Sequence, residues 1–213
     1  NLWYVYECGC SYLHNKNIIR AHFIFQNIIN IVLFLIKDQY DIYNFCLRRY
    51  MLNDLYRSII YFDGLAKNKF ACLALSKLNL IYSYLIQNKN KETEAIFLKE
   101  FEEMKNDKTV QQYEFKSIEE LIKQIENDFY TILKKMQNLT KNYEIHYLCV
   151  KYFLKKNKLL MAIKSIKVLS ENKSNYYYIS SLKLIKKYVQ ENKANINEII
   201  VNKAKEFMSD DEK

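Results

Sequence analysis

Proline and glycine are almost missing from this sequence. Its 213 residues include no proline and two glycines, Gly9 and Gly64. Tight turns between strands usually need one of these residues, so the composition argues against an all-β fold and a Rossmann-type α/β fold. Two isolated glycines cannot form a glycine-rich phosphate loop. An all-α fold remains, with helices joined by polar turns rich in asparagine and lysine.

Cysteine and histidine are too few and too scattered for a disulfide framework or a metal site. The five cysteines are Cys8, Cys10, Cys46, Cys72 and Cys149. An odd number of dispersed cysteines with apolar neighbours favours free thiols in a reducing compartment such as the cytosol. One residue separates the first two, and no second pair follows, so we predict no zinc site.

Long apolar runs are also lacking. The strongest run, residues 28–36, is interrupted by Asn30. A bilayer-spanning helix needs roughly 20 apolar residues, so we expect no membrane insertion. The chain begins at Asn1 without a secretory signal, and we expect it to be a fragment of a longer protein.

The chain is basic, with a net charge of +9. This charge is compatible with a polyanionic partner such as nucleic acid, the ribosome, an anionic lipid or an inositol phosphate. Asparagine, lysine, isoleucine and tyrosine are all abundant, which is typical of an AT-rich coding sequence. Lysines on solvated helix faces therefore explain the charge equally well.

Apolar residues recur at helical spacing along almost the whole chain. The pattern predicts helices over residues 2–14, 17–36, 39–50, 52–65, 68–87, 91–105, 115–139, 142–156, 158–171, 175–190 and 195–207. The polar turns between many of these helices are short. Short turns make consecutive helices antiparallel, which predicts a series of helical hairpins.

Two of these hairpins carry a tetratricopeptide-like pattern of small and large residues. The first pattern comprises Gly9, Tyr12, Ala21, Phe25 and Ile28, and the second comprises Phe153, Ala162, Ile166 and Leu169. We therefore predict an all-α fold in which TPR-like hairpins stack into an α-α superhelix. Residues 1–87 and 119–213 are the predicted repeat regions. Residues 88–118 are strongly charged and are the best candidate for a mobile connector.

The sequence gives no signal for catalysis. His146 and Cys149 lie three residues apart, but no glycine-rich turn nearby offers an oxyanion hole. Adjacent acidic pairs such as Glu102–Glu103 point to different helix faces and cannot act as paired carboxylates. We predict a protein that is not an enzyme. A cysteine-dependent enzyme using Cys149 and His146 is the weaker alternative.

Two adjacent arginines, Arg48 and Arg49, stand out in a chain that otherwise prefers lysine. Arginine recognises phosphate or carboxylate through paired hydrogen bonds. A folded hairpin would bring further basic and hydroxyl groups beside them. The candidate ligand-binding residues are Arg48, Arg49, Tyr56 and Arg57. The alternative is structural, with the two arginines pairing with Asp54 or Asp63.

Three blocks of the sequence resemble the auxiliary subunit of the N-terminal acetyltransferase A complex. They cover residues 3–25, 38–85 and 144–169, in the same order as in that family. The motifs that carry the resemblance include Glu7-Cys8, Gln39-Tyr40-Asp41, Cys46-Leu47-Arg48-Arg49, Ile81-Tyr82 and Tyr152-Phe153. In the family, a long charged stretch separates the second and third blocks, where residues 88–118 lie here.

The resemblance implies a non-catalytic scaffold that holds the catalytic acetyltransferase subunit and anchors it to the ribosome in the cytoplasm. Acetyl-coenzyme A would be bound by the partner, and inositol hexakisphosphate by a basic site between the two subunits. Arg48 and Arg49 match the basic pair of that site. Tyr56 and Arg57 are added because they are close in sequence. Asn53 departs from the family, which tends to have a basic residue there.

The alternative function is a generic basic helical-repeat protein that binds RNA or the ribosome without an acetyltransferase partner. Salt distinguishes the two functions. Non-specific RNA binding weakens steeply as ionic strength rises, whereas a largely apolar scaffold interface is less sensitive.

Overall fold

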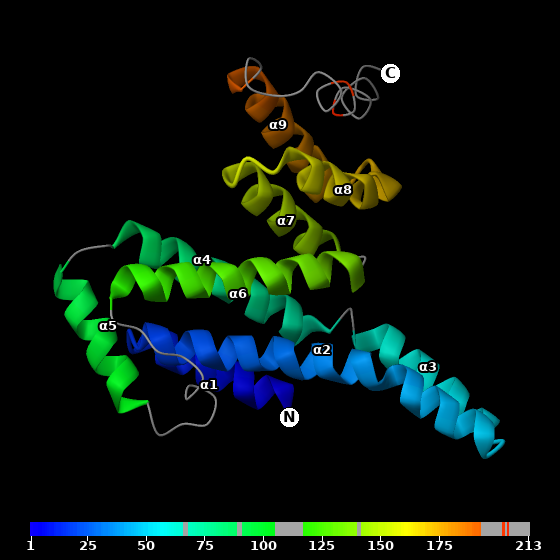
Figure 1. The fold of residues 1–213 in the computed structure, drawn as a ribbon. Coiled ribbons are helices and arrows are strands. Elements are labelled where there is room, and N and C mark those ends of the chain that lie inside the picture. Colours follow the sequence, from blue (N-terminus) through cyan, green and yellow to red (C-terminus); the bar gives the residue numbers. More distant parts are fainter. Residues whose placement is uncertain are drawn as a thin grey trace. The chain divides into compact units, whose positions relative to one another are not determined.

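The computed structural model describes residues 1–65, 68–88, 91–104, 117–139 and 142–192, together with residues 202 and 204. These residues form helices, and no strand occurs among them (Figure 1). The predicted all-α fold is confirmed. Contacts divide the chain into two compact units, Asn1–Lys135 and Met136–Lys213. The predicted boundaries at residues 87 and 119 stay a prediction, since residues 105–116 lie outside those described.

The first unit is built around one long helix. Its helices are α1 (Leu2–His14), α2 (Ile18–Arg48), α3 (Leu52–Leu65), α4 (Lys69–Gln87), α5 (Lys91–Glu103) and most of α6 (Ile118–Leu139). Helix α2 contacts α1, α3, α4 and α5. Helix α6 joins the same core, because its Phe129 ring stacks on Tyr82 of α4 with centroids 5.9 Å apart.

Helix α2 corrects one prediction. The sequence pattern predicted two helices, over residues 17–36 and 39–50, but the chain is one helix from Ile18 to Arg48. Lys37 and Asp38 interrupt the apolar periodicity without breaking the backbone, because neither residue is a strong helix breaker. Ile36 and Cys46 are buried on either side of this charged pair, so packing also holds the helix together.

The α1–α2 hairpin shows the predicted tetratricopeptide-like packing. A Cβ atom at Gly9 would lie 2.7 Å from Cε1 of Phe25. The backbone of α1 therefore lies directly on the Phe25 ring, which is fully buried. Ala21 and Ile28 are also fully buried on the same helix. Small residues at the crossing thus permit the close approach of the two helices.

The second unit repeats this design. Helices α7 (Tyr143–Lys155) and α8 (Leu159–Leu169) form a hairpin, and a short 3₁₀ turn, η1 (Ser170–Asn172), leads into α9 (Tyr176–Glu191). Helix α9 packs against both α7 and α8. The predicted pattern residues are all fully buried: Phe153, Ala162, Ile166 and Leu169. The second tetratricopeptide-like hairpin is confirmed.

Three hairpin turns use residues other than glycine in the left-handed backbone region. These residues are Lys16 (φ 63°), Tyr50 (φ 53°) and Asn157 (φ 56°). In each turn, the amide of the following residue donates to the carbonyl five positions earlier, at 2.9, 2.9 and 2.8 Å respectively. This is the Schellman pattern, which normally has glycine in the left-handed position. Because none of these residues is glycine, the left-handed backbone conformation costs conformational free energy at each turn.

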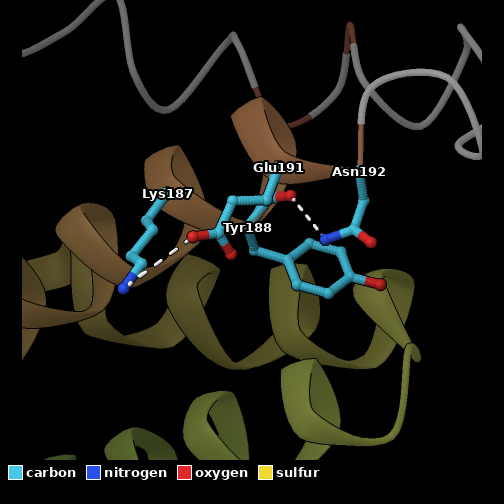
Figure 2. Close-up of polar contacts among 4 residues, drawn as sticks. All are labelled: Lys187, Tyr188, Glu191 and Asn192. Carbon is cyan, nitrogen blue, oxygen red and sulfur yellow. Dashed lines mark hydrogen bonds and ion pairs between the residues drawn. The ribbon is translucent and has the colours of Figure 1, made fainter.

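Asparagine caps several helices. The Oδ1 atoms of Asn68, Asn142 and Asn175 accept backbone amide hydrogen bonds at the starts of α4, α7 and α9. At the end of α9, the Asn192 side chain donates to the Tyr188 carbonyl oxygen at 3.0 Å (Figure 2). The abundant asparagine therefore satisfies helix-end groups that would otherwise lack partners.

The predicted connector is partly helical. Within residues 88–118, Lys91–Glu103 forms α5, whose Phe97 and Phe101 are buried. Helices α2 and α4 are long and apolar enough to cross a membrane by length and composition. Their packing against neighbouring helices accounts for much of that apolar character.

Most of the predicted helix 195–207 lies outside the described residues.

Candidate functional site

The four predicted ligand-binding residues lie at one end of the α2–α3 hairpin. Arg48 is the last residue of α2, and Arg49 is its C-cap. Tyr56 and Arg57 lie in the second turn of α3. The turn at Tyr50 reverses the chain, so both pairs belong to the same end of the hairpin, as the sequence predicted.

Buried contacts hold this hairpin together. Cys46 is 4% exposed and faces the interior one turn before the arginines. Further along, the ring of Tyr43 on α2 meets Phe62 on α3 edge-on, with centroids 5.7 Å apart. Figure 1 shows α3 returning along the C-terminal half of α2. The basic residues are therefore carried by a packed pair of helices.

The four side chains themselves are exposed. The guanidinium carbon of Arg49 lies 6.0 Å from the Phe45 ring centroid, at the outer limit of a cation–π contact. Among the described side chains, neither arginine forms an ion pair with Asp54, and the side chain of Asp63 lies outside those described. Among the described side chains, both arginines are therefore exposed and lack an ion-pair partner, while pairing with Asp63 stays a prediction. Their assignment to a phosphate-rich ligand stays a prediction.

The same hairpin exposes many large apolar side chains. On the C-terminal half of α2, in the turn and on α3 they are Phe34, Tyr40, Ile42, Phe45, Leu47, Tyr50, Met51, Leu52, Tyr56, Ile59, Ile60 and Tyr61. We call this set the hairpin surface. Contiguous exposed apolar patches are typical of interaction sites. The sequence pattern did not identify it, because these residues have the spacing of a helix core.

Cys149, the nucleophile of the cysteine-enzyme alternative, is not exposed in the second unit. Cys149 is fully buried, and burial raises the pKa of its thiol to about 12. A hydrogen bond with Ser165 offsets only part of this shift. The thiol stays protonated at neutral pH and cannot act as a nucleophile there. His146 is also fully buried, so the geometry argues against the cysteine-enzyme alternative.

Two buried polar residues were not identified from the sequence. Glu100 on α5 accepts a hydrogen bond from the Arg20 amide at 2.8 Å, and so caps the start of α2. Burial raises the pKa of the Glu100 carboxyl, while the backbone hydrogen bonds lower it. Gln137 donates to the Met161 carbonyl and to Ser165 Oγ at 2.9 and 2.6 Å. Both residues connect distant segments, which local sequence patterns do not reveal.

No metal site is evident. Among the described residues, no group of three or more histidine, cysteine, aspartate or glutamate side chains is placed to hold a metal ion.

Comparisons with known proteins show a likeness to a solved structure. No protein-family model matches the chain, and no curated protein matches it. A solved structure does match. It is a chain of the structure of Naa15/Naa10 bound to HypK-THB, with a TM-score of 0.62 and 16% sequence identity. The match covers 95% of this chain and 28% of that chain. At this identity the likeness shows a shared fold of TPR-like helical hairpins.

Proposed function

We propose that this chain belongs to a non-catalytic scaffold subunit that binds the catalytic subunit of an N-terminal acetyltransferase A complex. In this role it supports co-translational N-terminal acetylation at the ribosome, in the cytoplasm. Acetyl-coenzyme A is bound by the catalytic partner.

The observation that carries the proposal is the structural match over 95% of the chain. The matched structure names Naa15, Naa10 and HypK-THB together, so that chain is part of an assembly. The three sequence blocks that resemble the auxiliary subunit led to the same proposal, although no family model matches the chain. They were identified from residue order, whereas the structural match rests on the backbone.

The hairpin surface supports a protein partner. Protein interfaces are enriched in aromatic residues and arginine at their centres, with few lysines. Phe45, Tyr50 and Tyr56 of the hairpin surface are close in sequence to Arg48 and Arg49, and all five side chains are exposed. This composition differs from the lysine-rich helix faces elsewhere in the chain.

Purification of the tagged parent protein from its own cells tests the proposal. At moderate salt, mass spectrometry should find a small acetyltransferase subunit in one-to-one ratio with the parent. Recovery of ribosomal proteins and RNA alone, lost when salt is raised, would instead establish the generic RNA-binding alternative.

We also propose that Arg48, Arg49, Tyr56 and Arg57 bind inositol hexakisphosphate at the edge of the partner interface. Replacement of both Arg48 and Arg49 by glutamate should abolish this binding in isothermal titration calorimetry. It should also weaken assembly with the catalytic subunit at least tenfold, since charge-assisted contacts with phosphate are strong. The melting temperature should change little, because both side chains are exposed.

A matched control is available on α6. Lys134 and Lys135 are adjacent, exposed and also basic. Replacement of both by glutamate makes the same change in net charge and should leave ligand binding and assembly intact. Equal losses in the two double variants would show that net charge matters and that the arginine pair has no specific role.

A further inference from the structure

The positive charge of the chain is concentrated in α7 to α9. Residues 142–192 contain ten lysines and three glutamates. Residues 1–135 are nearly balanced, with eighteen basic and sixteen acidic residues. Codon bias toward lysine acts along the whole sequence and does not explain such a local excess. A local excess attracts polyanions to this part of the molecule.

Helices α7 and α9 lie side by side and run in the same direction. Near their starts, the rings of Tyr147 and Tyr177 contact each other, with centroids 5.5 Å apart. Near their ends, the Tyr188 hydroxyl lies 3.1 Å from Asn157 Oδ1, two residues beyond α7. In stacked hairpins, successive first helices line one continuous face, which such proteins use to bind extended ligands.

Tyrosine rings gather at the start of this face. Tyr147 contacts Tyr177, which in turn contacts Tyr176 with centroids 5.7 Å apart. The Lys151 ammonium lies 5.3 Å from the Tyr147 ring centroid. We call these four residues the tyrosine–lysine surface. They form an unbroken series of aromatic and cationic groups across two helices.

These rings are not part of the core. Tyr176 is 70% exposed, and Tyr147 and Tyr177 are half-buried, whereas the next residue, Tyr178, is 1% exposed. Lys151 is exposed and forms no ion pair with a described side chain. Lys187, further along α9, pairs with Glu191 at 3.8 Å (Figure 2). A cation that has no ion pair among the described side chains, Lys151, therefore lies beside the aromatic rings.

We propose that the tyrosine–lysine surface binds single-stranded nucleic acid, with bases stacked on the tyrosines and a phosphate held by Lys151. Single-strand binders combine these two features, because every base offers an aromatic face and every linkage a negative charge. An acidic peptide would use Lys151 but would gain little from the ring faces. A duplex keeps its bases stacked internally and would gain only the charge.

Fluorescence anisotropy of the whole 213-residue chain tests this directly. The probe is a labelled oligouridine of about ten nucleotides, within the range of roughly 4–16 that such surfaces occupy. It should bind at least tenfold more tightly than inorganic polyphosphate of equal charge, and more tightly than a duplex. If polyphosphate binds as tightly, charge alone is responsible and the proposal is overturned. Tighter binding of a glutamate decapeptide would assign the surface to an acidic protein instead.

Substitutions separate stacking from charge. Tyr176→Ser should weaken oligouridine binding about tenfold, and Tyr176→Phe should retain it, since the ring does the stacking. Lys151→Gln should lower the slope of log affinity against log salt by about 0.7, the value for one phosphate contact on a single strand. The fold should survive all three changes, because both side chains are exposed.

Tyr40→Ser is the matched control. Tyr40 is 68% exposed, close to the value for Tyr176, but lies on α2. This variant should bind oligouridine as the wild type does. Equal affinity of the Tyr176→Ser and Tyr40→Ser variants would remove the tyrosine–lysine surface as the binding site. The assay uses no acetyltransferase partner, so its outcome is independent of the proposed scaffold function.

Discussion

Gly9 and Gly64 are both inside helices, but their surroundings differ. A Cβ at Gly9 would meet Phe25 at 2.7 Å, whereas nothing lies within 4 Å of one at Gly64. The Phe25 ring cannot easily move away, because it is fully buried against Tyr6 with centroids 5.7 Å apart. Gly9 is therefore needed for packing, and Gly64 is not.

Alanine at each position tests this difference. Both changes gain helix propensity, by up to about 1 kcal/mol. At Gly9 that gain is outweighed by overpacking, which costs about 1–3 kcal/mol. Gly9→Ala should lower the free energy of unfolding by about 1–2 kcal/mol, and Gly64→Ala should leave it unchanged or raise it. Urea denaturation of both variants measures the effect. Equal changes would mean that α1 does not pack tightly on Phe25.

The residue scale also shows where sequence reasoning succeeded. Gly9, Ala21 and Phe25 were identified because a small residue at a helix crossing leaves a local pattern of spacing. Glu100 and Gln137 were missed because their partners, Arg20 and Met161, lie far away in sequence. Nothing in the residues around Glu100 indicates that it caps another helix.

The turns of the helical hairpins show how the chain folds with so little glycine. Tyr50 occupies the left-handed position between α2 and α3, while Asn157 occupies the same position between α7 and α8. Asparagine adopts this conformation readily, but a bulky residue costs about 1–2 kcal/mol. The Tyr50 side chain is 89% exposed, so its packing contributes little to the free energy of folding. Strain of this kind is typical of functional positions.

Exchanging the two turn residues tests the cost. Tyr50→Asn should raise the free energy of unfolding by about 0.5–1 kcal/mol, because the backbone strain is relieved. Asn157→Tyr should lower it by more than this amount, because Asn157 also accepts a hydrogen bond from Tyr188. Thermal or urea denaturation gives both values. If Tyr50→Asn destabilises the protein, the exposed ring contributes to the fold after all.

Element boundaries followed from the sequence where polar turns ended an apolar pattern. The starts of α4, α7 and α9 agree with the predicted helices to within a residue or two, because asparagine caps mark them. The single long helix α2 was missed, because charge at Lys37 and Asp38 resembles a turn. A charged pair ends a helix only if the backbone also gains an alternative partner there.

For the whole molecule, the sequence predicted the architecture but not the surfaces. Hydrophobic spacing determines which residues are buried together, and that sufficed for the all-α fold. Whether the hairpin surface is exposed depends on which helices are neighbours in space. The spacing of apolar residues along the sequence does not show which helices are neighbours. The arginine pair was found because it departs from the composition. The tyrosine–lysine surface was missed because tyrosine and lysine are both abundant in this sequence.

We expect the stability of the molecule in acid to depend on a buried histidine in the first unit. His22 on α2 is 2% exposed, and neither ring nitrogen has a hydrogen-bond partner among the described residues. Burial lowers its pKa from 6.5 to about 4. The unfolded chain therefore binds a proton between these pH values that the folded chain does not. Stability from this site is fully present above pH 6.5 and is lost as pH falls toward 4.

The size of this loss follows from the shift in pKa, which corresponds to about 3 kcal/mol. Urea unfolding from pH 7 to pH 4 should show the decline, and His22→Met should make it shallower by this amount. Glu100 has the opposite effect on stability, because burial raises the pKa of its carboxyl. In the His22→Met variant, the effect of Glu100 should remain as a small increase in the free energy of unfolding as pH falls. Ile19→Val, at another buried position of α2, should lower stability by about 1 kcal/mol and keep the wild-type slope. If His22→Met also keeps that slope, the acid sensitivity belongs to other groups, and His22 reaches solvent in the folded protein.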